Sequence, residues 1–550
     1  MELFANNIKV PYGGKISLKF FNPLFNDIGT YSFPISFPSR LPVINKAFGF
    51  PVNQESGDPG TIEAIIKSNI INLVGNWQIN ETQGGSVGAY YKGSNGDFYS
   101  RIKDKLLTDL EFGGIHYPAG IGADVGTVLA FMTTKMDSVY PDNDWNAFMV
   151  YMPNAIAGAG TEVNPITHDE DTGIPRFTNP GATLNSTVYL FAGTILDYIF
   201  SEYGYRIEKN IFKEDEDLKR LVIFNTYNRY ADDAFDYTKL VPKILISDFL
   251  KAIRNKFNVG FFINEQNRSV KILSFDSIIL SGPMPGKLNS SALKVNKNKI
   301  TGLSFGINSP DEWSSNKFAS LEEIDPNNTL ITVDKYNDIN AGMFEKKVFV
   351  IAESTYYDVG WTGIATRICP DQFIFITGNN PTDVEQLSGT LGMYTLNKNF
   401  ETAVEYIVPR CDLESNRSGY AYTVFPLIFL LSRGKQDCQV YYIPGAFERQ
   451  YPMGTSDIYN AKGDAIGGAT LALRWHGNYG IIERFWANRI NWELNSKVIT
   501  TTSFLGKDLS KLLDFSSIIR SGGSNYLINS LNVELSNKIT RITEAELFRL

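Results

Sequence analysis

The sequence predicts an α+β protein that is predominantly β, with several barrel-like or sandwich-like β modules and a few short amphipathic helices. Aromatic residues make up 13% of the 550 residues, a level that suits half-buried strands. The 46 Gly and 24 Pro residues are scattered along the chain, as turns between many short strands require. Short segments in which polar and apolar residues alternate recur throughout, and this period is typical of strands with one buried face.

The N-terminal region supplies the clearest alternation. Residues Lys15–Phe20 predict a half-buried strand, and Tyr31–Pro38 alternate again. Pro34 and Pro38 remove hydrogen-bond donors from the second segment, so we expect it at a sheet edge or across a subunit boundary. Further strands are predicted at these segments: Ile62–Ser68, Leu73–Glu81 and Val87–Lys92.

Three helices follow from a period of three to four residues. Apolar residues from Phe98 to Leu110 predict the first, with Asn95 or Asp97 as a cap. The second runs from Ser186 to Tyr203 and ends at Gly204. Ser247 caps the third, which ends near Phe257. A strand, a turn and a returning strand are expected directly after it, at Val259–Ile263, Asn264–Arg268 and Val270–Phe275.

The remaining chain is expected to be loops and strands. Residues 111–184 are rich in Gly, Pro and Asn and predict long loops with short strands. Strands are predicted at Ile300–Ile307, Leu330–Val333, Lys347–Ala352, Gln372–Thr377, Ala421–Leu431 and Val440–Pro444, followed by a C-terminal hairpin that turns at Ser536–Lys538. Five modules result: a β domain with a closing helix (1–115), a loop-rich insertion (116–185), an α+β module (186–290), a β-rich domain (291–470) and a C-terminal β domain (471–550).

Charge and hydropathy limit the classes of partner. The net charge is −8 and no long basic run occurs, which argues against sequence-independent binding of DNA or RNA. The N-terminus lacks a basic start with a long apolar core, so no secretory signal is predicted. The longest apolar stretch, Tyr422–Leu431, is half the length of a membrane helix and contains Pro426. We therefore expect a soluble chain without stable membrane insertion.

Catalytic, metal and cofactor motifs are not found. The three Cys residues are far apart and predict buried free thiols. The run from His168 to Asp171 and the run from Asp142 to Asp144 are interpreted as solvated loops rather than ion sites. Residues Gly120–Gly126 do not fit the dinucleotide fingerprint. No catalytic residue, no metal ligand and no cofactor is predicted, and we do not expect an enzyme.

Trp475, His476, Trp486 and Trp492 form the most unusual aromatic cluster of the sequence, with Gly and Arg between them. Two interpretations remain open. Aromatic rings beside Gly and His can stack on sugars. The same residues can instead form a packed core or a subunit contact, since Trp, Tyr and Arg anchor interfaces.

Three stretches resemble structural tail proteins of tailed phages and prophages. They are KFFNPLFNDIGTYSFPISFP with NKAFGFP, then ISDFLKAIRNKFNVGFFINEQNRSVKIL, and finally RWHGNYGIIERFW with SNYLINSLNVEL. The middle stretch is similar to the helix–hairpin unit of tail hub and late-control proteins. The resemblance implies tube-like β domains that form a ring around the tail channel, as a trimer or alternatively a hexamer, and link the tail tube to the tip.

The resemblance also implies partners and a location. The partners would be other copies of the chain and tube, distal tail, tip or fibre proteins, with DNA only as passing cargo. The protein would be assembled in the host cytoplasm into the virion tail. Candidate interface residues are Phe20, Phe21, Tyr31, Phe33, Phe37, Trp475, His476 and Trp486. The alternatives are a receptor- or carbohydrate-binding tail protein and a virion-associated glycan hydrolase.

Overall fold

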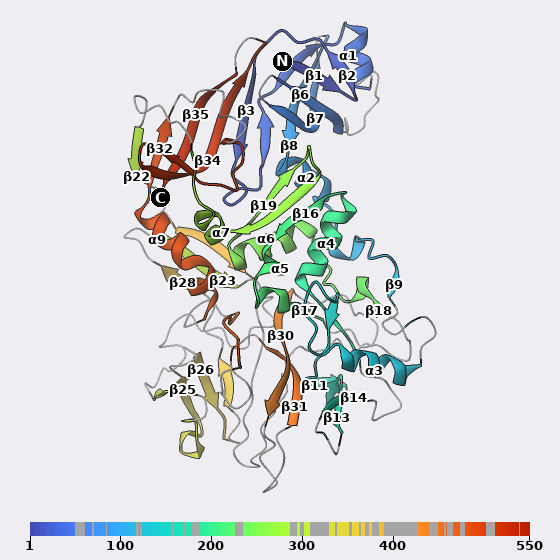
Figure 1. The fold of residues 1–550 in the computed structure, drawn as a ribbon, viewed down its shortest axis with the longest axis vertical. Coiled ribbons are helices and arrows are strands. Elements are labelled where there is room, and N and C mark those ends of the chain that lie inside the picture. The colour runs from blue at the N-terminus through green and yellow to red at the C-terminus, as the bar shows by residue number, and fades with distance from the viewer. Residues whose placement is uncertain are drawn as a thin grey trace.

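The computed structural model describes most of the chain at both ends and less of its centre. It describes residues 1–49, 61–68, 71–83, 85–116, 120, 124–156, 159–169, 172, 174–178, 186–225, 235–285, 294–297, 302–307, 329–335, 338–350, 355–361, 365–368, 373–376, 384–389, 427–438, 449–455, 458, 466–473, 479–501, 512–537 and 540–550. The molecule is elongated, with a large sheet at one end, an α+β unit in the middle and several small sheets at the other end (Figure 1).

The large sheet has 14 strands that come from both ends of the chain. Its N-terminal strands are β1 (Glu2–Ala5), β2 (Ile8–Val10), β3 (Ile16–Phe21), β4 (Thr30–Ser32), β5 (Ile35–Pro38), β6 (Thr61–Lys67), β7 (Asn72–Gln83) and β8 (Ser86–Gly93). Its later strands are β21 (Met284–Pro285), β22 (Lys294–Lys297), β32 (Lys497–Thr501), β33 (Ile519–Ser521), β34 (Ser524–Leu535) and β35 (Thr540–Arg549). The main order is β2-β1-β6-β7-β8-β4-β3-β34-β35-β32-β22.

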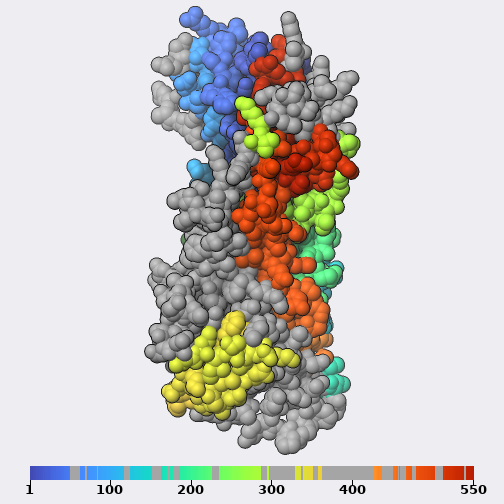
Figure 2. Space-filling view, turned by 90° about the vertical axis from the view of Figure 1, so that its left-hand side faces the viewer, coloured from blue at the N-terminus to red at the C-terminus, as the bar shows by residue number. Residues whose placement is uncertain are grey.

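Strand β3 joins the two ends of the chain. It pairs antiparallel with β34 from Ile16 opposite Leu535 to Phe21 opposite Ser530. Figure 2 shows N-terminal and C-terminal residues side by side at the upper end of the molecule. The sheet therefore combines strands from the predicted modules 1–115 and 471–550. One core covers its inner face, and that core includes Leu18, Phe20, Phe37, Trp77, Tyr91, Leu531, Val533 and Leu547.

The segment Tyr31–Pro38 differs from the prediction of one edge strand. It forms two strands, and Phe33-Pro34 separates them. Strand β4 lies inside the sheet between β3 and β8. Strand β5 pairs with β8 alone among the described strands. Pro34 ends the first strand because it has no backbone donor for the ladder.

The α+β unit follows the predicted order. It contains α4 (Ala192–Glu202), β16 (Arg206–Asn210), α5 (Ile211–Glu214), α6 (Ile246–Phe257), β19 (Val259–Asn264), β20 (Ser269–Ser274) and α7 (Phe275–Leu280). The strands form the sheet β16-β20-β19. Helix α6 starts after Leu245, without the predicted side-chain cap from Ser247, and ends at Asn258 in the left-handed conformation. The predicted helix–strand–turn–strand element is confirmed.

Helix α4 starts later than predicted and ends where predicted. Residues 189–190 form β15 (Tyr189–Leu190) before the helix begins. At the other end, Gly204 N–H donates to the Ser201 carbonyl and Tyr205 N–H donates to the Phe200 carbonyl. Gly204 has left-handed backbone geometry with a φ of +75°, which this pair of terminal hydrogen bonds requires.

Two predictions for the region between residues 95 and 184 are corrected. Helix α2 (Asn95–Ile102) is shorter than expected, and the 3₁₀ turn η2 (Leu107–Asp109) follows it after a break. The region 111–184 contains the helix α3 (Val125–Thr134), which we did not predict. Asp124 caps α3 by accepting a hydrogen bond from Thr127 N–H at 3.0 Å. The Gly residues before Asp124 concealed this start because they are typical of a loop.

Short strands and turns make up the rest of the described chain up to residue 455. They are β9 (Ile115–His116), β10 (Trp145–Asn146), β11 (Val150–Ile156), β12 (Ala159–Val163), β13 (Ile166–His168), β14 (Pro175–Phe177), η3 (Leu218–Arg220), β17 (Leu221–Phe224), β18 (Phe235–Asp236), η4 (Tyr237–Lys239), β23 (Gly302–Ile307), β24 (Ile331–Val333), η8 (Ala341–Met343), β25 (Lys346–Val350), β26 (Thr355–Val359), β27 (Ala365–Ile368), β28 (Phe373–Ile376), β29 (Val384–Gly389), β30 (Ile428–Cys438) and β31 (Arg449–Thr455). The strand predicted at Val440–Pro444 lies outside the described residues.

The helices complete the architecture. Helix α1 (Pro42–Ala47) lies beside β2, and a π-helical turn η10 (Ile482–Trp486) continues into α9 (Ala487–Asn495). The sequence analysis did not predict this C-terminal helix. No helix in the described part of the chain is long and apolar enough to cross a membrane. The α+β class with a predominance of β is confirmed, and the described strands of the large sheet form an open order from β2 to β22.

Candidate functional site

The loop Asn22–Gly29 connects the large sheet to the α+β unit. Asn22 anchors it, because its backbone N–H donates to the Asn529 carbonyl at 2.9 Å and its Nδ2 donates to the Ile528 carbonyl at 2.7 Å. Asn22 Oδ1 accepts from Leu24 N–H at 2.9 Å. Buried amides of this kind are stable only when their donors and acceptors are paired. The loop is therefore fixed to β34.

The loop also meets the start of β19. A Cβ on Gly260 would lie 3.2 Å from the backbone N and Cα of Leu24, closer than most Cβ contacts, so glycine favours this approach. Asp27 forms an ion pair with Arg254 of α6. From α2, Asn95 Nδ2 donates to the Phe261 carbonyl at 2.7 Å. The large sheet and the α+β unit are thus in direct backbone contact.

Helix α9 reaches the same place from the C-terminal region. Asn258 Nδ2 donates to the Phe485 carbonyl at 2.7 Å, and Asn258 Oδ1 accepts from Arg489 Nη1 at 2.8 Å. Arg489 Nε donates to Glu493 Oε1 at 2.7 Å, and this pair is almost fully buried. The Arg489 guanidinium lies over the rings of Phe25 and Trp486, at 4.9 and 4.8 Å. Such a planar cation can stack on rings and bind a carboxylate at once.

We call this place the junction: the loop Asn22–Gly29, residues Asn258–Phe261 and residues Phe485–Glu493. An aromatic cluster closes it, in which Trp492 lies 4.8 Å from Phe548 and 6.0 Å from Phe25, measured between ring centroids. Arg489 and Asn258 were not among the residues predicted from the sequence. The i,i+4 spacing of Arg489 and Glu493 is the signal that was available, although it does not show that the pair is buried.

A second charged cluster lies beside the junction. Asp97 of α2 is fully buried and forms an ion pair with Arg101. Glu265 accepts from Tyr205 Oη at 2.5 Å and pairs with Arg268 at 3.1 Å. Burial raises the pKa of the Glu265 carboxyl, and the hydrogen bond from Tyr205 opposes this rise. Arg101 lies 3.9 Å from Glu265, so the cluster links α2 to the β19–β20 turn.

The predicted interface residues of the N-terminal strands divide between two faces of the large sheet. Phe20 and Phe37 belong to the core, with 4% and 0% exposure. Phe21 and Tyr31 point to the opposite face and stack with centroids 5.9 Å apart. Phe33 is 56% exposed and meets Tyr31 edge-on at 6.2 Å. Only Phe21, Tyr31 and Phe33 therefore offer surface to a neighbouring chain.

The C-terminal aromatic residues give a different outcome. Trp486 is 1% exposed, and its Nε1 donates to the Lys256 carbonyl at 3.4 Å. Trp486 is packed inside the chain, which fits the core interpretation, whereas Trp492 is partly buried against Phe25, Phe275 and Phe548. Trp475 and His476 lie outside the described residues.

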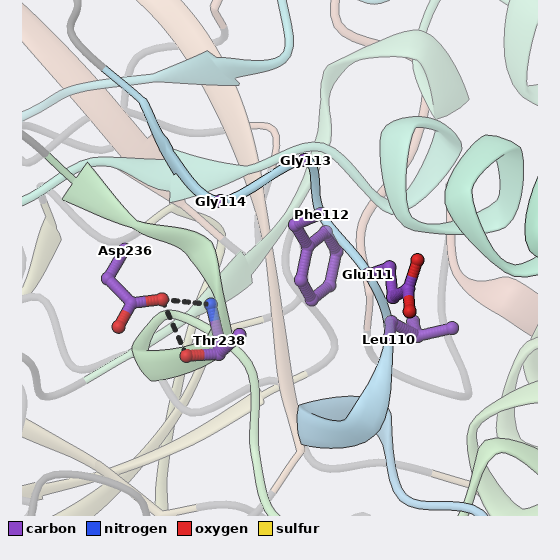
Figure 3. A pocket seen from close by; sticks show the side chains of 7 residues that line it. All are labelled: Leu110, Glu111, Phe112, Gly113, Gly114, Asp236 and Thr238. Carbon is purple, nitrogen blue, oxygen red and sulfur yellow. Dashed lines mark hydrogen bonds between the residues drawn. The ribbon is translucent and has the colours of Figure 1, made fainter.

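A cavity of about 500 Å³ lies near β9 and β18 (Figure 3). Its lining consists of Leu110, Glu111, Phe112, Gly113, Gly114, Asp236 and Thr238. Asp236 Oδ1 accepts from both the backbone N–H and the hydroxyl of Thr238, at 3.1 and 2.5 Å. Both bonds are local and make Asp236 the N-cap of η4, which is a structural role.

Two further acidic residues, Asp144 and Asp197, lie against the tyrosines of this region. Tyr140 Oη donates to Asp197 Oδ2 at 2.9 Å and accepts from Asn210 Nδ2 at 3.1 Å. Burial raises the pKa of both Asp197 and Asp144. The ring of His116 stacks on Tyr237 at 3.7 Å. These contacts connect α4, β16 and the 140–146 segment, which is a structural role.

His168 and Asp169, the described residues of the run from His168 to Asp171, make contacts within the protein. His168 Nε2 lies 2.8 Å from the Gln450 carbonyl, and Asp169 pairs with Arg176 at 2.7 Å. Among the residues that the structure describes, no group of three His, Cys, Asp or Glu is arranged to hold a metal ion.

No family model matches the chain, and no curated protein matches its sequence. Among solved structures, the chain is similar to the 43 kDa tail protein of prophage MuSo2 from Shewanella oneidensis, with 7% identity, a TM-score of 0.33, and 100% of this chain and 97% of that chain covered. It is also similar to a tail protein from Neisseria meningitidis MC58, with 7% identity, a TM-score of 0.30, and coverage of 100% and 95%. Likeness at these scores establishes neither a shared fold nor a shared function.

Proposed function

We propose that this chain is a structural component of a phage tail that acts by assembly. One observation carries the proposal: the three stretches that resemble structural tail proteins lie far apart in the sequence but meet at the junction. Asn22 belongs to the first stretch, Asn258 and Gly260 to the second, and Phe485 with Ile528 to the third. The resemblance therefore covers one physical unit rather than three separate segments.

The finer proposal is a tail hub. The chain would form a ring of three copies, or alternatively six, around the tail channel and link the tail tube to the tip during assembly and genome delivery. Its partners would be tube, distal tail, tip or fibre proteins, and its location the virion tail. The buried ion pairs and amide contacts of the junction support this role, because a connector must hold its sheet and its α+β unit in a fixed orientation.

The proposal also holds that the chain is not an enzyme. In the described cavity, the Asp236 carboxylate caps η4 by accepting from Thr238, and the Tyr140 hydroxyl is bonded to both Asp197 and Asn210. A carbohydrate-binding role for the C-terminal tryptophans is less well supported, because Trp486 and Trp492 are packed against the protein itself.

The first test is the mass of the purified chain by size exclusion with light scattering, followed by negative-stain imaging of the same peak. We expect a ring of three or six copies with a central hole. A compact monomer that also fails to enter tails when it is produced with its neighbouring tail proteins would contradict the proposal. Binding to a glycan array, or hydrolysis of host polysaccharide, would favour the receptor-binding or hydrolase alternative.

A point variant tests the proposed N-terminal subunit contact better than a truncation does. Removing residues 1–40 would delete β1 to β5 and with them much of the large sheet. Phe33→Asp changes only an exposed ring. We expect this variant to fold and to lose ring formation, whereas Phe33→Tyr retains it.

A further inference from the structure

The outer face of the large sheet, opposite its core, carries two strips of unlike character. The first is the aromatic–basic strip: Lys19, Phe21, Tyr31 and Lys92, on β3, β4 and β8. The register places Lys92 opposite Tyr31, and Tyr31 opposite Lys19. Neighbouring strands lie about 4.8 Å apart, so the two lysines flank the aromatic rings.

The second is the acidic strip, Glu544 and Glu546 on β35. The same row continues into it, because Lys19 lies opposite Asn532 of β34 and Asn532 lies opposite Glu544. The next row across the strands runs from Phe21 through Ser530 to Glu546, because Ser530 lies opposite both residues. Both strips thus share one face, and the spacing of the strands puts about 10 Å between Lys19 and Glu544.

The charges of the two strips have no ionic partners among the described residues. Lys19 Nζ lies over the Phe21 ring at 4.9 Å, and Lys92 Nζ over the Tyr90 ring at 5.4 Å. Glu544 accepts from Asn532 at 2.7 Å, and Glu546 accepts from the Ser530 hydroxyl at 3.4 Å. Glu534, between the strips, differs because it pairs with both Lys15 and Arg541.

The aromatic residues add an apolar contribution to this face. Phe21 and Tyr31 are partly exposed and stack on each other. Exposed aromatic rings with charges around them are typical of contact surfaces between proteins. A surface with a basic half and an acidic half is complementary to a copy of itself turned by a two-fold rotation.

We infer that the outer face binds the same face of a second copy, with the aromatic–basic strip of each chain over the acidic strip of the other. This contact is isologous, whereas a ring requires heterologous contacts between neighbours. The inference therefore goes beyond the proposed tail role and does not depend on it. In a hexamer, each copy would form this two-fold contact with one other copy.

Single-stranded nucleic acid is the other class of occupant that aromatic rings and lysines on a sheet can bind. The acidic strip argues against it. Glu544 and Glu546 lie on the same face beside the lysines, and they would repel a phosphate backbone that crosses the sheet.

The test uses two double variants and their mixture. Lys19→Glu with Lys92→Glu gives a face that is acidic on both strips, and Glu544→Lys with Glu546→Lys gives a face that is basic on both. Sedimentation velocity over a range of protein concentrations measures self-association. We expect the wild type to form pairs, either of single copies or of whole rings, that separate with added salt, and on the order of 100-fold weaker pairing for each double variant alone.

Mixing the two variants is the decisive step. An acidic face and a basic face are complementary again, so an equimolar mixture should restore association close to the wild-type level. The matched control is Lys243→Glu with Lys251→Glu, which has the same change in charge at exposed positions of the α+β unit and should associate like the wild type.

Other outcomes overturn the inference in distinguishable ways. A trimeric ring that is unaffected by either double variant would retain the tail role and reject the two-fold contact. A wild type that is monomeric at all concentrations would reject the contact as well. Binding of a fluorescent oligothymidine that is lost with Lys19→Glu and Lys92→Glu, without self-association, would assign the strip to nucleic acid.

Discussion

Phe20 and Phe21 are adjacent in β3 and have opposite environments. Phe20 points to the core of the large sheet and is 4% exposed. Phe21 points to the outer face, where it stacks on Tyr31 and lies under Lys19. Side chains alternate along a strand, so a shift of one residue exchanges the two faces. The comparison shows that aromatic composition alone does not separate residues that stabilise the fold from residues that are available to a partner.

The charged residues of the junction and of the outer face also differ in burial and in ion pairing. At the junction, Arg489 and Glu493 are buried and paired with each other and with amides. On the outer face, Lys19, Lys92 and Glu544 are accessible and form no ion pair in the described structure. The buried, paired charges of the junction are required for stability, whereas the accessible charges of the outer face are available for association.

The largest effect is expected at the junction. Arg489→Ala leaves the Glu493 carboxylate buried without its cation and should lower the free energy of unfolding by about 3–5 kcal/mol. Arg541→Ala is the control, because it breaks an exposed ion pair with Glu534 and should cost less than about 1 kcal/mol. Chemical denaturation followed by tryptophan fluorescence measures both. Equal losses would remove the distinction between the two regions.

The next effect compares the two phenylalanines of β3 directly. Phe20→Ala should destabilise the large sheet by about 3 kcal/mol or more through loss of buried contacts and a cavity. Phe21→Ala should cost about 1 kcal/mol, since its ring is only partly buried. Thermal unfolding of the two variants gives the difference. A larger loss for Phe21→Ala would show that the outer face is covered within the folded chain.

A smaller effect concerns pH at the charged cluster beside the junction. The pKa of Glu265 is raised by burial above its ordinary value of 4.5, so the folded state binds this proton more tightly than the unfolded state. Its stabilising contribution is complete below pH 4.5 and is lost as the pH rises through the folded pKa. Glu265→Gln should make the unfolding temperature less dependent on pH above 4.5, and Glu81→Gln, at an exposed position, should not. An unchanged slope in the Glu265→Gln variant would exclude this carboxyl as the source.

The smallest effect on stability is expected at Phe33. Phe33→Ser should change the unfolding temperature by less than about 2 °C, because the ring is 56% exposed and contributes little to folding. Its association in light scattering should nevertheless fall. A variant that unfolds early would place Phe33 with the core residues.

The sequence could predict the local elements with strong periodicity. The alternation in Ile16–Phe21 and the amphipathic pattern of Ile246–Phe257 both correspond to real elements, because one side of each is buried. Helix α3 and helix α9 were missed. Glycines precede the first, and in the second Arg489 and Glu493 occupy buried positions that a hydrophobic pattern reserves for apolar residues.

By itself the sequence determined the class of the fold, the stop of α4 at Gly204 and the helix–hairpin unit around Asn258, since these depend on contacts within a few residues. Tertiary structure alone decided that β3 pairs with β34 across more than 500 positions, that Trp486 is buried while Phe33 is exposed, and that Lys19 and Glu544 share a face. Such relations depend on which strands become neighbours, and strand pairing over long separations is set by the fit of whole faces rather than by local preference.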